Sequence, residues 1–116
     1  MTASAQAACG RIERVRLLND LLRCHRLGGQ VVVTTGVQAL GPPFIDRLCE
    51  AVARFDAFTP DNDPHGEHDF GLVTVEGRAC LFKIEYLDRS LRFHSPDPAD
   101  PNVTHRVMIL MLAEEY

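Results

Sequence analysis

The sequence predicts an α+β domain, with a small and mainly antiparallel sheet of three to five strands packed against two or three helices. Two segments, residues 9–27 and 43–57, have apolar residues at helical spacing. Three segments are rich in the β-branched and aromatic residues typical of strands: residues 31–35, 70–76 and 79–87. The chain has 116 residues, of which 46% are hydrophobic and 24% are charged, and this fits one folded domain.

The N-terminal part predicts a flexible end followed by a helix and a strand. Residues 1–8 are small and polar, so we expect them to be flexible and the compact domain to span residues 9–116. In the first helix, valine and leucines form one stripe, and Arg16, Asn19, Arg23 and Arg26 fall on the other side. Gly28 and Gly29 end this helix, because glycine readily adopts the left-handed conformation found there. The strand at 31–35 does not alternate, which predicts burial on both faces.

The middle of the chain predicts a helix and a β-hairpin joined by a polar loop. Pro42 and Pro43 lie next to the expected start of the second helix, where proline is tolerated because no intrahelical hydrogen bond is lost. The two hairpin strands are separated by Glu76, Gly77 and Arg78, which predict a tight turn.

The C-terminal part predicts a short strand, a proline-rich segment and an apolar segment that fits two types of element. Residues 91–94 predict a short further strand, and residues 95–102 contain three prolines, which exclude a helix or an inner strand. In residues 105–115, methionine, leucine, alanine and glutamate favour a helix. The nearly continuous apolar run would also suit a central strand. We expect a helix here and keep the central strand as the alternative.

Charge is unevenly distributed along a chain whose net charge is −4. Residues 1–29 carry five arginines against two acidic residues, a net charge of +3. Residues 30–116 carry seven basic and fourteen acidic residues, a net charge of −7. No basic tract is interleaved with aromatic residues, so we expect no direct binding of nucleic acid. The acidic part favours a basic protein partner instead.

The sequence predicts neither a membrane anchor nor export. No apolar run approaches the roughly 20 residues that cross a bilayer. The start of the chain lacks the apolar segment of a signal peptide, so we expect a cytoplasmic protein. The four cysteines include no C-x-x-C pair, and in that compartment we expect them to be reduced thiols.

The loop at residues 61–71, DNDPHGEHDFG, holds the densest group of candidate ligands. Its first half matches an EF-hand calcium loop through Asp61, Asp63 and Gly66, but Leu72 stands where a bidentate glutamate should close the shell. A divalent transition metal could use the imidazoles and carboxylates at a less regular spacing. The candidate metal ligands are Asp61, Asp63, His65, Glu67, His68 and Asp69.

The favoured interpretation of this loop is structural. Asp and Asn side chains accept backbone hydrogen bonds in turns, and Asn62, Asp63 and Pro64 are typical turn residues. We therefore expect a rigid, hydrogen-bonded corner with no metal or other cofactor. We also expect no catalytic residues, because Ser90 and Ser95 lack a nucleophile-elbow pattern and no phosphate-binding glycine loop is present.

Six stretches of the chain together resemble a known family. They are NDLLR at 19–23, VVVTTGV at 31–37, DNDPHGEHDFG at 61–71, FKIEYLD at 82–88, SPDPADP at 95–101 and RVMILMLAEEY at 106–116. In combination they are similar to the family of domain of unknown function 3768, seen mainly in alphaproteobacteria and often on plasmids and other mobile elements. The resemblance implies a bacterial, cytoplasmic accessory protein. It supplies no catalytic residues, because no activity is assigned to the family.

The chain departs from the family pattern in two places. Members tend to read K-I-D-Y-Y-D where this chain has KIEYLD at 83–88. They also tend to read R-V-L-T-I-M-L where this chain has RVMILML at 106–112. Glu85 keeps the negative charge on a longer side chain, which puts in doubt its use as a precise ligand.

Three functions fit these observations. The first is a small acidic interaction protein without catalytic activity, which blocks a nucleic-acid-handling host complex as anti-CRISPR or anti-restriction proteins do. Its interaction residues would be Asp61, Asp63, Glu67, Asp69, Asp97 and Asp100. The alternative is a metal-dependent hydrolase or nuclease that uses the Asp61–Asp69 loop. The third is a subunit of a homodimer or larger homo-oligomer, which associates through apolar surface of the last segment.

Overall fold

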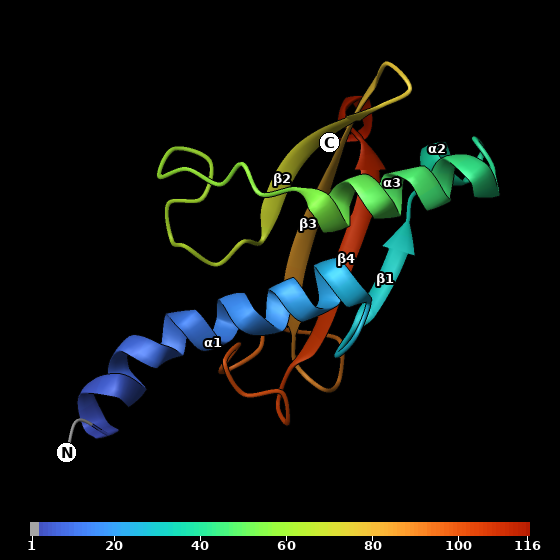
Figure 1. The fold of residues 1–116 in the computed structure, drawn as a ribbon. Coiled ribbons are helices and arrows are strands. Elements are labelled where there is room, and N and C mark those ends of the chain that lie inside the picture. The colour runs from blue at the N-terminus through green and yellow to red at the C-terminus, as the bar shows by residue number, and fades with distance from the viewer. Residues whose placement is uncertain (1–2) are drawn as a thin grey trace.

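The computed structural model describes the backbone of residues 3–116 and the side chains from Gly10 onward, and it contains three helices and a four-stranded sheet (Figure 1). In chain order the elements are α1 (Ala3–His25), β1 (Gln30–Val33), α2 (Thr35–Gln38), α3 (Pro42–Arg54), β2 (Phe70–Val75), β3 (Arg78–Leu87), β4 (His105–Leu112) and the 3-10 turn η1 (Ala113–Glu115). The predicted α+β class is confirmed. In this described part of the chain, no helix is both long and apolar enough to cross a membrane.

The sheet has the strand order β1-β4-β3-β2. β1 runs parallel to β4, with Val32 beside Ile109, and the other two pairs are antiparallel. β4 therefore lies inside the sheet, while β1 and β2 form its edges. The sheet is mainly antiparallel, as predicted, with one parallel pair that the sequence did not indicate.

The helix expected at residues 105–115 is wrong, because this segment is a strand followed by a short turn. Met108 and Leu110 of β4 are buried in the core cluster, and Val107 and Met111, which point to the other face of the sheet, are also buried. A central strand with apolar residues on both faces has no polar side. Its composition therefore suited a helix as well as a strand.

Other boundaries differ less. α1 begins at Ala3 rather than at residue 9; residues 1 and 2 lie outside the described residues, and the flexibility of residues 1–8 stays a prediction. The prediction of a strand at 91–94 is wrong. A single bridge joins His94 to Leu87, because the chain between them forms a tight turn. The short helix α2 was not expected.

α1 and α3 lie on the same side of the sheet, where they enclose the core (Figure 1). Leu22 of α1 and Leu48 of α3 are fully buried there, together with Phe82 of β3 and Leu110 of β4. Gly71 of β2 admits this packing, because a Cβ atom at that position would lie 2.5 Å from the ring of Phe82. The aromatic layer beside β2 thus depends on a glycine within the strand.

The β2–β3 hairpin closes through the predicted turn. Glu76 and Gly77 both have positive φ angles, 52° and 79°, which define a two-residue loop of type I′. This turn matches the twist of the strands. It also fixes the register in which β2 and β3 pair.

Candidate functional site

The segment of residues 56–69, which we call the corner, connects α3 to β2 and lies beside α1. Two side chains of α1 bind its backbone: Arg16 Nη1 donates to Gly66 O at 3.0 Å, and Asn19 Nδ2 donates to Glu67 O at 2.9 Å. These bonds satisfy carbonyl groups that no regular ladder reaches. The polar loop is therefore held against the first helix.

Asp63 organises the turn within the corner. Its carbonyl accepts from Gly66 N at 3.1 Å, and its carboxylate accepts from the N–H groups of Glu67 at 3.1 Å and His68 at 3.2 Å. The residue is only 8% exposed. Gly66, with a φ of 69°, supplies the left-handed conformation that this turn requires. The Asp63 carboxylate is thus an internal acceptor, as expected of a structural turn.

The imidazole of His68 is held between α1 and an aromatic side chain. Its Nδ1 lies 3.0 Å from Asp20 Oδ1, and its Nε2 lies 3.7 Å from Asp63 Oδ2. The ring stacks on Phe58 with centroids 3.8 Å apart and planes at 5°. Asp20 also accepts from Arg23 Nη2 at 2.8 Å. The histidine therefore joins the corner to the helix through polar and stacking contacts.

A buried hydrogen-bond network joins the corner to the sheet. Tyr86 OH donates to Glu67 Oε1 at 2.8 Å and accepts from Asn19 Nδ2 at 2.7 Å. Asn19 Oδ1 accepts from Arg106 Nε at 2.6 Å, and Arg106 Nη2 donates to Pro98 O. Asn19 and Arg106 are 0% and 1% exposed. Three distant parts of the chain thus meet through a single buried asparagine.

Burial sets the protonation of this network. It raises the pKa of the Tyr86 phenol far above the usual value of 10.0, and the hydrogen bond from Asn19 only partly opposes this shift. Burial also lowers the pKa of the Arg106 guanidinium. The phenol therefore stays protonated and donates its hydrogen bond to Glu67.

The six candidate metal ligands do not converge. Asp63, Glu67 and His68 bind the protein groups described above. Asp61 and His65 are exposed. Asp69 lines a separate cleft. Within residues 10–116, no group of three or more His, Cys, Asp or Glu side chains could hold a metal ion. The metal site stays a prediction that this arrangement does not support.

The segment Asp88–His94, which we call the outer loop, repeats the turn made by Asp63. The carbonyl of Asp88 accepts from Leu91 N at 2.9 Å, and its carboxylate accepts from Arg92 N at 3.1 Å and Phe93 N at 3.4 Å. The three donors follow the aspartate by three, four and five residues, as they do in the Asp63 turn. Leu91, with a φ of 63°, occupies the position that Gly66 holds in the corner.

The outer loop directs large side chains into solvent. Leu91 is 54% exposed and Phe93 is 68% exposed. Ser90 Oγ donates to Asp88 Oδ1 at 2.7 Å, and this bond, with those from Arg92 and Phe93, lowers the pKa of the Asp88 carboxyl. The loop backbone is therefore fixed by several bonds to one carboxylate.

A cleft of about 380 Å³ lies beside the outer loop. It is lined by Asp69, Ile84, Glu85, Tyr86, Leu87, Arg92, Phe93 and His94. Burial, followed by the nearby Glu67 carboxylate, raises the pKa of Asp69. The rings of Tyr86 and His94 meet edge to face at 6.2 Å. The cleft combines apolar walls with two carboxylates, and it is the place where one corner residue meets the outer loop.

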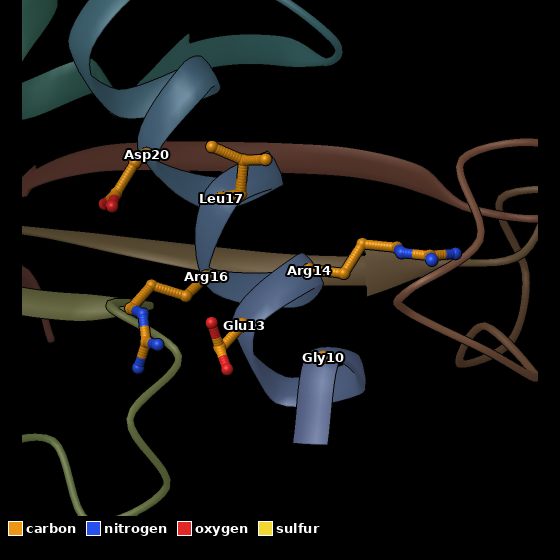
Figure 2. A pocket seen from close by; sticks show the side chains of 6 residues that line it. All are labelled: Gly10, Glu13, Arg14, Arg16, Leu17 and Asp20. Atoms are coloured by element: carbon orange, nitrogen blue, oxygen red, sulfur yellow. The ribbon is translucent and has the colours of Figure 1, made fainter. Parts of the chain in front are cut away.

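A second groove, of about 440 Å³, runs along α1 (Figure 2). Arg14 and Arg16 point to opposite sides of the helix, and Arg16 is already bound to Gly66. Glu13 and Asp20 line the same groove and offset the positive charge. The groove therefore offers no concentrated charge of either sign.

The remaining two predicted interaction residues shape the proline-rich segment. The carboxylate of Asp97 accepts from Ala99 N at 3.1 Å and pairs with Arg11 at 3.0 Å. The carboxylate of Asp100 accepts from Asn102 N at 2.9 Å. Of the six acidic residues, Asp69 alone lines the cleft, and the interaction role of all six stays a prediction.

Sequence reasoning missed the residues that position the corner, namely Asn19, Tyr86 and Arg106. The prediction that Asn19 and Arg23 lie on the polar side of the first helix is wrong, because both side chains are buried. A signal for Asn19 was present, because it falls at helical spacing between Val15 and Leu22 on the buried stripe of α1. A polar residue on such a stripe needs a buried partner.

The fold and these contacts define a small α+β domain whose densest polar loop is an internal brace. The family model described as "Protein of unknown function (DUF3768)" matches residues 33–115, so the chain belongs to this family. No curated protein and no solved structure matches the chain.

Proposed function

We propose that the protein is a non-catalytic binding module that docks a protein partner on the outer loop and the adjoining cleft. The observation that carries this proposal is the outward display of Leu91 and Phe93 on a backbone fixed by Asp88. Binding hot spots are enriched in aromatic residues and arginine, and Arg92 lies between the two apolar side chains. A preorganised loop also loses little entropy on binding.

Strain at Leu91 supports the same proposal. A leucine in the left-handed region is less stable there than glycine, which the matching turn of the corner uses. Strained residues of this kind gather at functional sites. The side chain of Leu91 is 54% exposed, so it contributes more to the surface than to the core.

The charge of the cleft indicates the class of partner. Asp69 and Glu85 line it with one arginine, Arg92, and Glu85 also pairs with Lys83 at 3.3 Å. The whole chain carries a net charge of −4. A basic side chain of the partner would meet these carboxylates while an apolar group packs on Phe93. Proteins that handle nucleic acids present such basic surfaces, so we propose that the partner belongs to a complex of this kind and is blocked by the docking.

Site-specific photo-crosslinking tests this proposal. A photo-reactive phenylalanine analogue replaces Phe93, and the same analogue at Tyr116, which is 74% exposed, is the matched control. Irradiation in lysate of the producing cells should link one partner to position 93, and no protein other than a second copy of this chain to position 116. The link should weaken with added salt, and Phe93→Ala should reduce affinity for the identified partner at least tenfold. Equal linking at both positions would contradict the proposal.

A metal-dependent hydrolase or nuclease remains a second candidate because Asp69 and His94 line the same cleft. A carboxylate and an imidazole are two kinds of group that such an enzyme uses, although among the described residues no third His, Cys, Asp or Glu side chain completes a metal site with them. Thermal melting with and without Mn²⁺ or Zn²⁺ tests this candidate. A rise in the midpoint that is lost in Asp69→Asn would favour it, and no shift would remove it.

A further inference from the structure

The edge strand β2 has a free row of backbone groups. Among the described strands its one neighbour is β3. The N–H of Ile84 donates to Asp69 O at 2.8 Å, so Asp69 and every second residue after it face β3. Phe70, Leu72 and Thr74 therefore direct their N–H and C=O groups away from the sheet.

This edge carries none of the features that protect edge strands from pairing. The six residues of β2 include no charge and no proline, and their register with β3 runs unbroken from Phe70 to Val75, without a bulge. Leu72 is 60% exposed. The opposite edge, β1, has four residues, and short edges are themselves protected. The free edge of β2 is the one suited to pairing.

We propose that a second copy of this chain pairs antiparallel with β2 and forms one continuous eight-stranded sheet across a two-fold axis. Centred on Leu72, the pairing sets Leu72 beside Leu72 of the second copy and Phe70 beside its Thr74. The three outward residues of each strand then share about six hydrogen bonds. One leucine pair and two phenylalanine–threonine pairs then meet on one face, and pairs of an aromatic with a β-branched residue stabilise sheets. This inference does not use the outer loop and shares only Asp69 with the cleft, so the backbone pairing that carries it stands apart from the proposed function.

Charge complementarity favours a second copy over another partner. The pairing sets the Asp69 end of one strand beside the Val75 end of the other, whose neighbour across the hairpin is Arg78. Arg78 is exposed, and its long side chain can reach toward Asp69 of the second copy. The two-fold axis repeats this opposite-charge contact at both ends of the seam.

Sedimentation equilibrium of the purified chain tests the proposal. The wild type should be a dimer that dissociates on dilution, and Thr74→Pro should be a monomer, because proline removes one outward N–H without breaking a bond to β3. Thr74→Val keeps the N–H and should remain a dimer. Should Thr74→Pro fail to fold, Leu72→Lys places a charge at the centre of the seam and should also be a monomer. A wild-type monomer at every concentration, or a dimer that survives both substitutions, would overturn the proposal.

Two further readouts locate the seam. Arg78→Glu should raise the dimer dissociation constant severalfold, while Arg89→Glu, an equal charge change in the outer loop, should leave it unchanged. Equal effects of the two changes would overturn the contact assigned to Arg78. Amide exchange of Phe70, Leu72 and Thr74 should slow as the dimer forms. A dimer in which these three amides exchange as fast as in the monomer would place the interface elsewhere and overturn the proposal.

Discussion

The corner and the outer loop contain the same aspartate-centred turn, but the turn is covered in the corner and exposed in the outer loop. In each, an aspartate carbonyl accepts from the residue three positions on, and its carboxylate accepts from the next two N–H groups. In the corner, the turn is buried against α1, and the ring of His68 stacks on Phe58. In the outer loop, the same turn leaves Phe93 68% exposed.

The difference shows that a concentration of polar residues does not locate a binding surface. The corner holds most of the candidate ligands, yet Asp63, Glu67 and His68 bind groups of the protein itself. The outer loop is less conspicuous in sequence and displays more apolar surface. What distinguishes the two is whether α1 covers the turn.

The largest expected effect on stability comes from removing the hydrogen bonds that hold the corner against α1. Asn19→Ala removes the buried acceptor of Arg106 Nε and the donor to the partly buried Glu67 O. The free energy of unfolding should fall by about 3 kcal/mol, since unsatisfied buried polar groups are strongly destabilising. Urea denaturation measures it, with Leu17→Ala on the exposed side of α1 as the control, expected within about 0.5 kcal/mol of wild type. A loss below about 1 kcal/mol would show that the network does not brace the corner.

The two organising aspartates should differ in importance. Asp63→Ala leaves two N–H groups of a buried turn without their acceptor and should lower the free energy of unfolding by about 2 kcal/mol. Asp88→Ala should have a clearly smaller effect on unfolding, because water replaces the lost bonds at the surface. The same urea measurements compare the pair. An equal loss in both variants would contradict the distinction between a buried and an exposed turn.

Exchanging the residues at the left-handed position sharpens the comparison further. Gly66→Ala should destabilise by about 1 kcal/mol, because the added Cβ is strained at a φ of 69° even though space is available. Leu91→Gly should leave stability unchanged or raise it by about 0.5 kcal/mol, while weakening the partner binding proposed above. Melting midpoints and the crosslinking assay measure the two effects. A destabilised Leu91→Gly would mean that this side chain serves the fold.

The smallest effects concern pH. Hydrogen bonds lower the folded pKa of Asp88 below the usual value of 3.8, so its contribution to stability is complete above that pH and is lost as the pH falls through the folded pKa. Burial raises the folded pKa of Asp69 above 3.8, so its contribution is present below that pH and is lost as the pH rises through the folded pKa. Carboxyl carbon shifts followed by NMR should show Asp88 titrating at lower pH than Asp69. The reverse order would contradict both assignments.

The sequence was most informative where local chemistry decides structure. The Glu76-Gly77 turn and the proline start of α3 follow from backbone preferences of single residues. The polar corner was expected to be hydrogen-bonded, because Asp63 stands where an aspartate caps a turn. These features need no knowledge of distant parts of the chain.

The sequence was least informative where contacts between distant segments of the chain determine the local structure. β4 has a composition that suits a helix, and its place between β1 and β3 settles its form. The link from Asn19 to Arg106 spans most of the chain, and no local pattern joins them. The outer loop was expected to contain a strand, because Leu91 gives no sign that it adopts a positive φ.

Hydrogen exchange measured residue by residue in increasing denaturant tests the central distinction most directly, and it requires no partner. The amides of Glu67 and His68 should exchange only through global unfolding, with a strong dependence on denaturant. The amides of Arg92 and Phe93 should exchange through local opening that denaturant barely affects. If the corner amides exchanged by local opening as well, the contrast between an internal brace and an outward display would be wrong.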